Sequence, residues 1–207
     1  MESFTKVTGL AAPLLRASID TDQIIPTRFL ARLSEEGLGE GLFAQWRLLP
    51  DGTPNPDFIL NREPWSQAQI LVAGPNFGCG SSREAAPRAL RQRGFRALIA
   101  PSFGDIFYNN CFRNGIAPVR LSLQALERLS KLLEQNGQAV AIELTVDLEQ
   151  NQVKVPTTGE NFHFEAPALL RRMLLDGLDE IELTRKQADA IEVFRNKDRA
   201  RRGWAYL

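Results

Sequence analysis

Residues 69–101 read QILVAGPNFGCGSSREAAPRALRQRGFRALIAP, and this stretch carries the strongest fold signal in the chain. Gln69–Ala73 is a short apolar run that a Gly-Pro pair ends, which predicts a buried strand. A helix is expected over residues 82–93, because Gly94 is a typical stop. The apolar run Ala97–Ala100 predicts a second buried strand. Strand, turn, helix and strand in this order form a parallel pair, so we predict an α/β fold.

The C-terminal half continues with short elements of both kinds. Leucines at helical spacing after Ser122 predict a helix that Gly137 ends. Alternating polar and apolar residues over 140–155 predict a β-hairpin. Pro167 suits the first turn of a further helix, and Gly177 is a suitable end for it. The pattern therefore remains that of an α/β protein.

The last part of the chain is predicted to be a helical tail. Thr184 and Gln187 have the spacing of a capping box, and a helix rich in Arg and Lys is expected from there to Arg202. We divide the chain into an α/β domain, residues 1–183, and a C-terminal basic tail, residues 184–207. The tail is expected to be a solvated face or a docking arm, not a nucleic-acid site.

Composition excludes several classes of protein. Lys and Arg together number 25, as do Asp and Glu, whereas a nucleic-acid binder shows a basic domain with a clustered patch. No apolar run approaches the roughly 18 residues that span a bilayer. The first residues, MESFTKVTGL, lack the features of a signal peptide. We expect a cytoplasmic protein that binds neither nucleic acid nor membrane.

Cysteine and histidine are scarce. Cys79 and Cys111 form neither a CxxC pair nor a zinc spacing, so no metal site is expected in this chain. Cys79 could be a reactive thiolate near a helix start, but a small unreactive role is favoured for both cysteines. Any histidine-based catalysis would depend on His163, which we interpret as a residue of a half-polar strand.

The segment Gly74–Arg83, GPNFGCGSSR, fits none of the phosphate-loop, dinucleotide or nucleophile-elbow motifs. Gly78 and Gly80 allow a tight turn whose N–H groups point outward. A helix that starts after this turn offers unpaired N–H donors to an anion. The Arg83 guanidinium can grip a carboxylate with two parallel hydrogen bonds. The segment is thus a candidate anion site.

Two structural alternatives compete with a functional role. Ser81 and Glu84 have capping-box spacing, so Ser81 could simply cap the helix. Pro87 would then lie past the first turn, which favours a cap nearer Glu84. The acidic pair in Asp20–Asp22 could bind a metal, but such residues more often form a turn.

Three segments resemble one protein family, in its order and at similar spacing. NFGCGSSRE at Asn76–Glu84 is similar to the signature of the aconitase swivelling domain. DTDQIIP at Asp20–Pro26 and APSFGDIFYNNCFRNGIAPV at Ala100–Val119 resemble signatures of isopropylmalate dehydratase small subunits. The resemblance implies a swivelling β/β/α domain, like domain 4 of aconitase, with a C-terminal helical tail.

The resemblance also implies an activity. Members of this family isomerise 2-isopropylmalate to 3-isopropylmalate by dehydration and rehydration in leucine biosynthesis. The small subunit is expected to act only with a large subunit, which holds a four-iron, four-sulfur cluster. The alternatives are a subunit for homoaconitate, citramalate or dimethylmalate, and a non-catalytic anion-binding module. The residues that select the substrate are expected within Leu30–Phe43.

Six residues receive roles through this resemblance. One matches the family's catalytic base, and the others match positions that line the pocket or contact a substrate carboxylate. The base is Ser81, and the substrate-binding residues are Arg83, Ser82, Gly80, Asp22 and Arg28.

The chain departs from the family pattern at two positions. Ala85 stands where the family usually has His, and Arg88 stands where it usually has Trp. These changes affect the predicted helix and a docking face that we expect to include Arg88 and the loop-like segment Asn109–Asn114.

Overall fold

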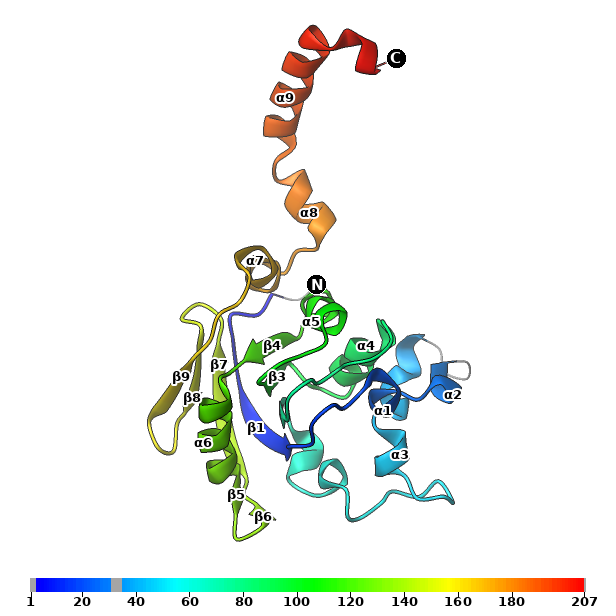
Figure 1. Cartoon of the computed structure of the whole chain (residues 1–207), viewed down its shortest axis with the longest axis vertical. Helices are drawn as coiled ribbons and strands as arrows, with labels where there is room; N and C mark the ends of the chain where they lie inside the picture. The colour runs from blue at the N-terminus through cyan, green and yellow to red at the C-terminus, as the bar shows by residue number, and fades with distance from the viewer. Residues whose placement is uncertain (1–2, 31–34, 207) are drawn as a thin grey trace.

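The computed structural model describes residues 3–30 and 35–206, and its main feature is a mixed seven-stranded sheet (Figure 1). The strand order is β4-β3-β2-β1-β7-β8-β9. The first four strands of this order run parallel, and the others are antiparallel to their neighbours. The strands, with a separate hairpin β5–β6, are β1 (Lys6–Leu14), β2 (Ile70–Ala73), β3 (Ala97–Ala100), β4 (Ala117–Arg120), β5 (Glu134–Gln135), β6 (Gln138–Ala139), β7 (Ile142–Asp147), β8 (Gln152–Val155) and β9 (Glu160–His163).

Helices lie on both sides of the chain in the view of Figure 1. Helix α4 lies beside the small helices α1–α3 at the right, and α6, at the left, packs against β1 and β5. Short 3-10 helices span Glu35–Gly41, Ile59–Asn61, Trp65–Gln67 and Gly203–Tyr206. The α-helices are α1 (Thr21–Ile24), α2 (Thr27–Leu30), α3 (Ala44–Arg47), α4 (Ala85–Gln92), α5 (Asp105–Arg113), α6 (Leu123–Leu133), α7 (Ala168–Asp176), α8 (Glu180–Arg185) and α9 (Ala188–Arg201).

The sequence prediction is confirmed at the centre of the sheet. β2 and β3 are buried along their whole length and pair in parallel, with α4 between them in the chain. The hairpin β7–β8 and the helix α7 also lie where they were expected. Helix α6 follows Ser122 as expected, but the prediction that Gly137 ends it is wrong: α6 ends at Leu133, and Gly137 lies in the turn between β5 and β6. Ser122 caps α6 by accepting a hydrogen bond from the Ala125 amide, and Gly177 ends α7 in the left-handed conformation.

The prediction of a loop over Asn109–Asn114 is wrong, because most of this segment belongs to α5. Asn110, Cys111 and Phe112 are buried there, so they are not available to a docking partner. Helix α5 packs against α4 and α7. Only Asn109 and Arg113 of these residues are exposed.

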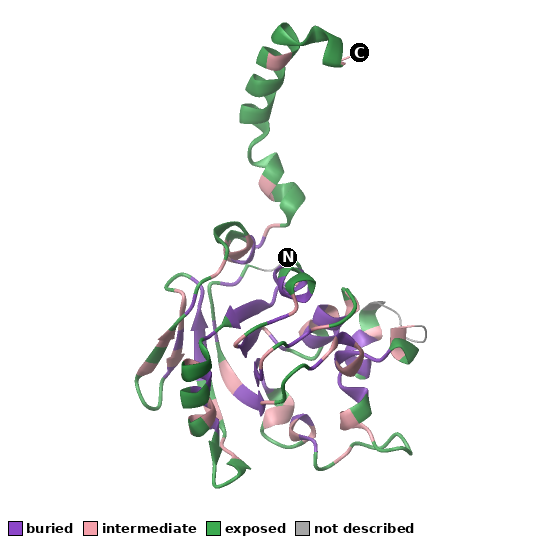
Figure 2. Ribbon diagram, viewed as in Figure 1, coloured by how far each residue is buried: buried purple, intermediate pink, exposed green. Residues whose placement is uncertain are grey.

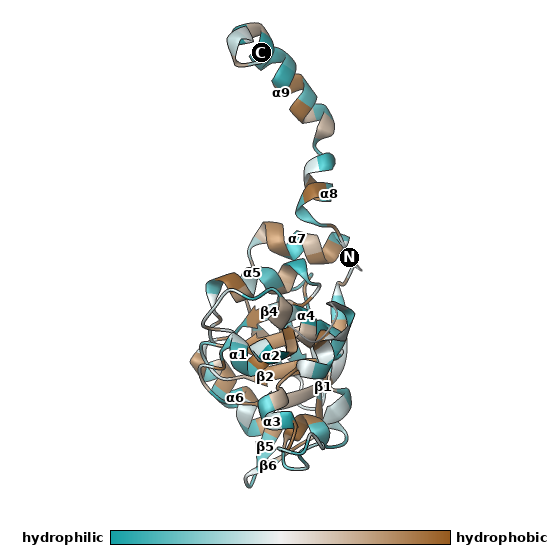
Figure 3. Cartoon of the chain, turned by 90° about the vertical axis from the view of Figure 1, so that its right-hand side faces the viewer, coloured by the Kyte–Doolittle hydropathy of each residue, from teal (hydrophilic) through white to brown (hydrophobic). Residues whose placement is uncertain are grey.

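The last two α-helices extend away from the sheet as an arm, residues 180–206 (Figures 1 and 2). No residue of α8 or α9 is buried. The capping box predicted at Thr184 is wrong, since Thr184 lies within α8 and the box is formed by Asp179 and Glu182. The predicted domain division after residue 183 falls inside this helix and stays a proposal. Figure 3 shows apolar segments along the exposed arm.

Candidate active site

The segment after β2 forms the tight turn that the sequence predicted. Gly78 and Gly80 have φ angles of 71° and 87°, a region that favours glycine. A side-chain carbon at Gly78 would lie 2.2 Å from the Phe107 ring, so only glycine fits there. The turn is thus packed tightly against α5 from below.

The N-terminal motif that begins at Asp20, with Ile19 before it, hydrogen-bonds to this turn. The Gly78 amide donates to the Ile19 carbonyl at 2.7 Å, and Asp20 forms a parallel bridge with Cys79. The Thr21 amide donates to the Cys79 carbonyl at 3.0 Å, and its Oγ1 donates to the carbonyl of Ser81 at 2.9 Å. Two of the segments that suggested the family are therefore in direct contact.

Ser81 does not cap the following helix. Helix α4 begins at Ala85, its N-cap is Glu84, and no side chain caps it. The cap near Glu84 that Pro87 favoured is confirmed, because Pro87 then falls in the first turn. Ser81 and Ser82 are exposed, and among the described residues no hydrogen bond reaches the Ser81 hydroxyl. The side chain is thus available for another role.

Arg83 is held by an aspartate from α1. Its Nη1 and Nη2 donate to Oδ1 and Oδ2 of Asp22 at 2.5 and 2.8 Å, and the Thr27 hydroxyl donates to Asp22 Oδ1 at 3.0 Å. The hydrogen bonds from Arg83 hold the pKa of the Asp22 carboxyl below its usual value; burial opposes this shift and the Thr27 hydroxyl assists it. The Arg83 side chain is 19% exposed, so its guanidinium is oriented and still accessible.

The remaining predicted residues differ in how they are placed. Arg28 is exposed on α2, with its guanidinium 5.2 Å from the centre of the Phe29 ring. Asp20 caps α1 through a capping box with Gln23, so it does not pair with Asp22 around a metal. His163 is exposed on β9, as expected for a half-polar strand.

The donor set of this chain does not fit an iron–sulfur cluster. The sequence has two cysteines, and Cys111 is fully buried, which raises the pKa of its thiol well above the usual value. Clusters are normally held by three or four cysteine thiolates. Within residues 3–30 and 35–206, no three His, Cys, Asp or Glu side chains are grouped to hold a metal ion. No helix in the same ranges could cross a membrane.

Sequence reasoning missed two threonines of the site. Thr21 touches Ser81 and Thr27 touches Asp22, yet neither was given a role. Threonine is common in turns and helix starts, so its presence alone carries little signal. The predicted specificity segment, Leu30–Phe43, lies partly outside the described residues, and within the described part Leu42 and Phe43 are buried.

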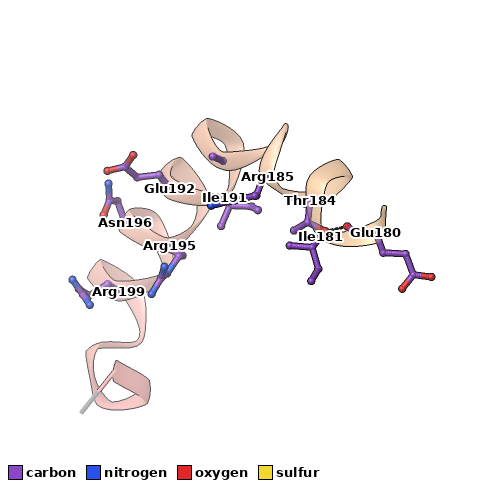
Figure 4. A pocket seen from close by; sticks show the side chains of 10 residues that line it. Glu180, Ile181, Thr184, Arg185, Ile191, Glu192, Arg195, Asn196 and Arg199 are labelled. Atoms are coloured by element: carbon purple, nitrogen blue, oxygen red, sulfur yellow. Dashed lines mark hydrogen bonds between the residues drawn. The ribbon is translucent and has the colours of Figure 1, made fainter. Parts of the chain in front are cut away.

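A hollow of 750 Å³ lies elsewhere, in the arm (Figure 4). It is lined by residues of α8 and α9, and Figure 4 shows Ile181 on α8 beside Glu180 and Ile191 on α9 near Arg195. None of the predicted site residues reaches it. The candidate active site therefore remains the turn and not this hollow.

Comparisons with known proteins agree with the sequence motifs. Residues 1–124 match the family described as Aconitase C-terminal domain. The chain is 50% identical over 205 residues to the 3-isopropylmalate dehydratase small subunit of Agrobacterium fabrum, covering 99% of this chain and 100% of that one. The Brucella abortus protein of that name is 49% identical over the same shares.

A solved structure supports the fold. The crystal structure of 3-isopropylmalate dehydratase from Methanocaldococcus jannaschii matches with a TM-score of 0.63 and 24% identity, covering 93% of this chain and 99% of that one. With the family match, this likeness confirms the predicted α/β swivelling domain.

Proposed function

We propose a catalytic role for the Gly78–Arg83 turn on one premise: this chain belongs to the family of 3-isopropylmalate dehydratase small subunits. It is therefore part of a two-subunit hydro-lyase of leucine biosynthesis, whose other part is a large subunit. The enzyme isomerises 2-isopropylmalate to 3-isopropylmalate. Water leaves from two neighbouring carbons and returns with the hydroxyl on the other carbon.

Ser81 is the base in this proposal. As an alkoxide, its Oγ takes the proton from the carbon next to a substrate carboxylate, while the hydroxyl leaves the neighbouring carbon and a double bond forms between the two. The observation that carries this role is the free Ser81 hydroxyl, which neither caps α4 nor bonds another described residue. N–H groups of the turn and nearby cations would stabilise the alkoxide.

Arg83 binds a substrate carboxylate in this proposal, and Asp22 orients it. A guanidinium has five N–H donors, and Asp22 accepts from two of its nitrogens. A substrate carboxylate then uses the remaining donors or displaces Asp22. Ser82, Gly80 and Arg28 complete the substrate-facing surface in our proposal.

The iron–sulfur cluster is assigned to the large subunit, and the face that docks on that subunit is assigned to this chain. Because this chain lacks the cysteines for a cluster, we propose that the large subunit holds the four-iron, four-sulfur group, which would supply Lewis-acid chemistry when bound. The docking face is proposed around Arg88, which pairs with Glu84 at 3.1 Å, and the exposed Asn109. A cytoplasmic location is proposed as well, and cell fractionation would test it.

The test is reconstitution with the large subunit. The small subunit alone should be inactive and iron-free, and the complex should turn over 2-isopropylmalate. Ser81→Ala should lower kcat by about 10²- to 10⁴-fold, the usual contribution of a general base, with substrate binding largely retained. Ser130→Ala, on α6, is the matched control and should keep normal activity.

Two results would contradict the proposal. Turnover by the small subunit alone would remove the need for a partner. A Ser81→Ala complex with near-normal kcat would show that the base is another group. Preference of the complex for homoaconitate, citramalate or dimethylmalate would reassign the substrate and leave the base in place.

A further inference from the structure

Thr21 is buried beneath the candidate active site although its side chain is polar. It is 1% exposed, and its Oγ1 donates a hydrogen bond of 2.9 Å to the carbonyl oxygen of Ser81. Its own amide donates to the Cys79 carbonyl at 3.0 Å. One residue thus holds the turn at two points, on either side of Gly80.

The turn needs such a support at this place. Glycine has more backbone freedom than other residues, and Gly78 and Gly80 stand on either side of Cys79. Ser81 and Ser82 follow in a bend before α4 begins, where no helix hydrogen bonds hold them. A side-chain carbon on Gly80 would lie 3.9 Å from Thr21 Oγ1, so the hydroxyl lies close to the second glycine.

The contact with Ser81 is made by the Thr21 side chain and not by backbone hydrogen bonds. Gly78 bonds Ile19 and Thr21 bonds Cys79 through their backbones, as in a short parallel ladder. Any residue except proline has the amide that these backbone bonds need at position 21. The additional bond to the Ser81 carbonyl needs a side-chain donor, which the Thr21 hydroxyl supplies.

We infer that Thr21 is a positioning residue for the dehydratase reaction: its hydroxyl fixes the Ser81 peptide and so aims the Ser81 side chain at the substrate. The inference rests on the proposed role of Ser81 as the base. Thr21 touches neither substrate nor reacting atoms. Its effect therefore falls on the chemical step, because a small displacement of a reacting group lowers the rate far more than it weakens binding.

The test compares three variants in the reconstituted two-subunit enzyme. Thr21→Val keeps the branched shape and loses the donor, Thr21→Ser keeps the donor, and Thr145→Val is the control. Thr145 is also buried, and its hydroxyl bonds that of Thr8 at 2.8 Å on the β1–β7 side of the sheet. The control therefore loses a comparable buried hydrogen bond far from Ser81 in the fold.

Thr21→Val should lower kcat by about 10- to 100-fold and change KM by less than about threefold. Thr21→Ser should restore kcat to within about threefold of the original enzyme. Thr145→Val should keep kcat while melting at a temperature similar to that of Thr21→Val. Hydrogen exchange of the peptide covering residues 78–84 should be faster in Thr21→Val than in Thr21→Ser.

The outcomes separate this inference from the proposed function. If Ser81→Ala is inactive but Thr21→Val and Thr145→Val have the same kcat, the positioning role is overturned and the base assignment stands. Equal losses in Thr21→Val and Thr21→Ser would also overturn it, since the hydroxyl would not be the cause. A Thr21→Val chain that fails to fold would assign Thr21 to stability instead. If Ser81→Ala keeps its kcat, the proposed function itself fails.

Discussion

The Gly74–Arg83 turn and the C-terminal arm, residues 180–206, both present side chains to solvent, but their backbones are supported very differently. Within the turn, Phe77 and Gly78 are buried, the buried Phe107 ring packs against Gly78, and the Thr21 amide donates a hydrogen bond to the Cys79 carbonyl. In the arm, no residue of α8 or α9 is buried, and Phe194 and Trp204 are 63% and 74% exposed.

The turn is therefore exposed on a fixed backbone, whereas the arm is exposed without packing against the domain. Ser81 is exposed on a backbone whose position is set by glycines, aromatic rings and a buried threonine, so its geometry can serve chemistry. The arm depends on its own helix hydrogen bonds and a few ion pairs. Isolated helices of this length are marginal in water, so the arm gains little stability from this chain.

The largest effect is expected from disturbing the support of the turn. Gly78→Ala places a carbon 2.2 Å from the Phe107 ring at a φ of 71°, so α5 or the turn must move. We expect a loss of about 4 kcal/mol or more in the free energy of unfolding, as for severe overpacking with backbone strain. Gly52→Ala is the control, because it has a φ of 86° and no atom within 4 Å. It should cost only about 1–2 kcal/mol; equal losses in urea unfolding would mean that packing under the turn is loose.

A smaller effect, on kinetics and not on stability, is expected from replacing the Arg83 guanidinium. Arg83→Lys keeps the charge but loses the fork that bonds both oxygens of Asp22. We expect kcat/KM of the reconstituted enzyme to fall by about 10- to 100-fold, through a higher KM and a lower kcat, with an unchanged melting temperature. Arg185→Lys in the arm should leave kinetics unchanged. Normal kinetics in Arg83→Lys would show that two-point recognition is not used.

A buried carboxylate of the sheet, Asp147 on β7, and an exposed one of the arm, Glu180, should respond differently to acid. Burial raises the pKa of Asp147, but the Gln150 amide and the ammonium groups of Lys6 and Lys154 outweigh it and hold the pKa below the usual value. Its folded pKa is thus lower than its unfolded pKa of about 4, so its contribution is complete above pH ~4 and is lost as pH falls through the folded pKa.

Asp147→Asn should therefore lower the free energy of unfolding by about 1–2 kcal/mol at pH 7, and the difference from the original chain should shrink below pH ~4. Glu180→Gln is the control in the arm, where Glu180 pairs with Arg113 at 2.8 Å and both side chains are about half exposed. It should cost less than about 1 kcal/mol. Urea unfolding between pH 3 and 7 measures both, and a pH-independent difference for Asp147→Asn would contradict the assignment.

The smallest effect on stability is expected from removing the arm. Deleting residues 179–207 should change the free energy of unfolding of the remaining domain by less than about 1 kcal/mol, because no residue of α8 or α9 is buried. Deleting α7 as well should be much more harmful, since Met173 and Leu174 are 1% and 0% exposed. A large loss on removing the arm alone would show that it packs on the domain.

Local sequence determined the parts of the fold that depend on neighbouring residues. The apolar runs of β2 and β3, the start of α6 after Ser122 and the Gly177 end of α7 could be predicted, because each is set by residues within a few positions. The family motifs also indicated that Ser81 and Arg83 belong to the site. The motifs could not indicate which atoms of the segments Asp20–Pro26 and Asn76–Glu84 are in contact.

The tertiary structure decided the rest. The sequence prediction did not include β1 or β4, since each contains a proline and neither alternates; β1 becomes a central strand only through its pairing with β2 and β7. The same long-range pairing brings Thr21 under Ser81, which lies 60 positions later in the chain. Ser81 could have capped a helix by spacing alone, and the actual start of α4 at Ala85 settled the competition. Local patterns specify elements, whereas burial and hydrogen bonding between distant segments decide which residues share a site.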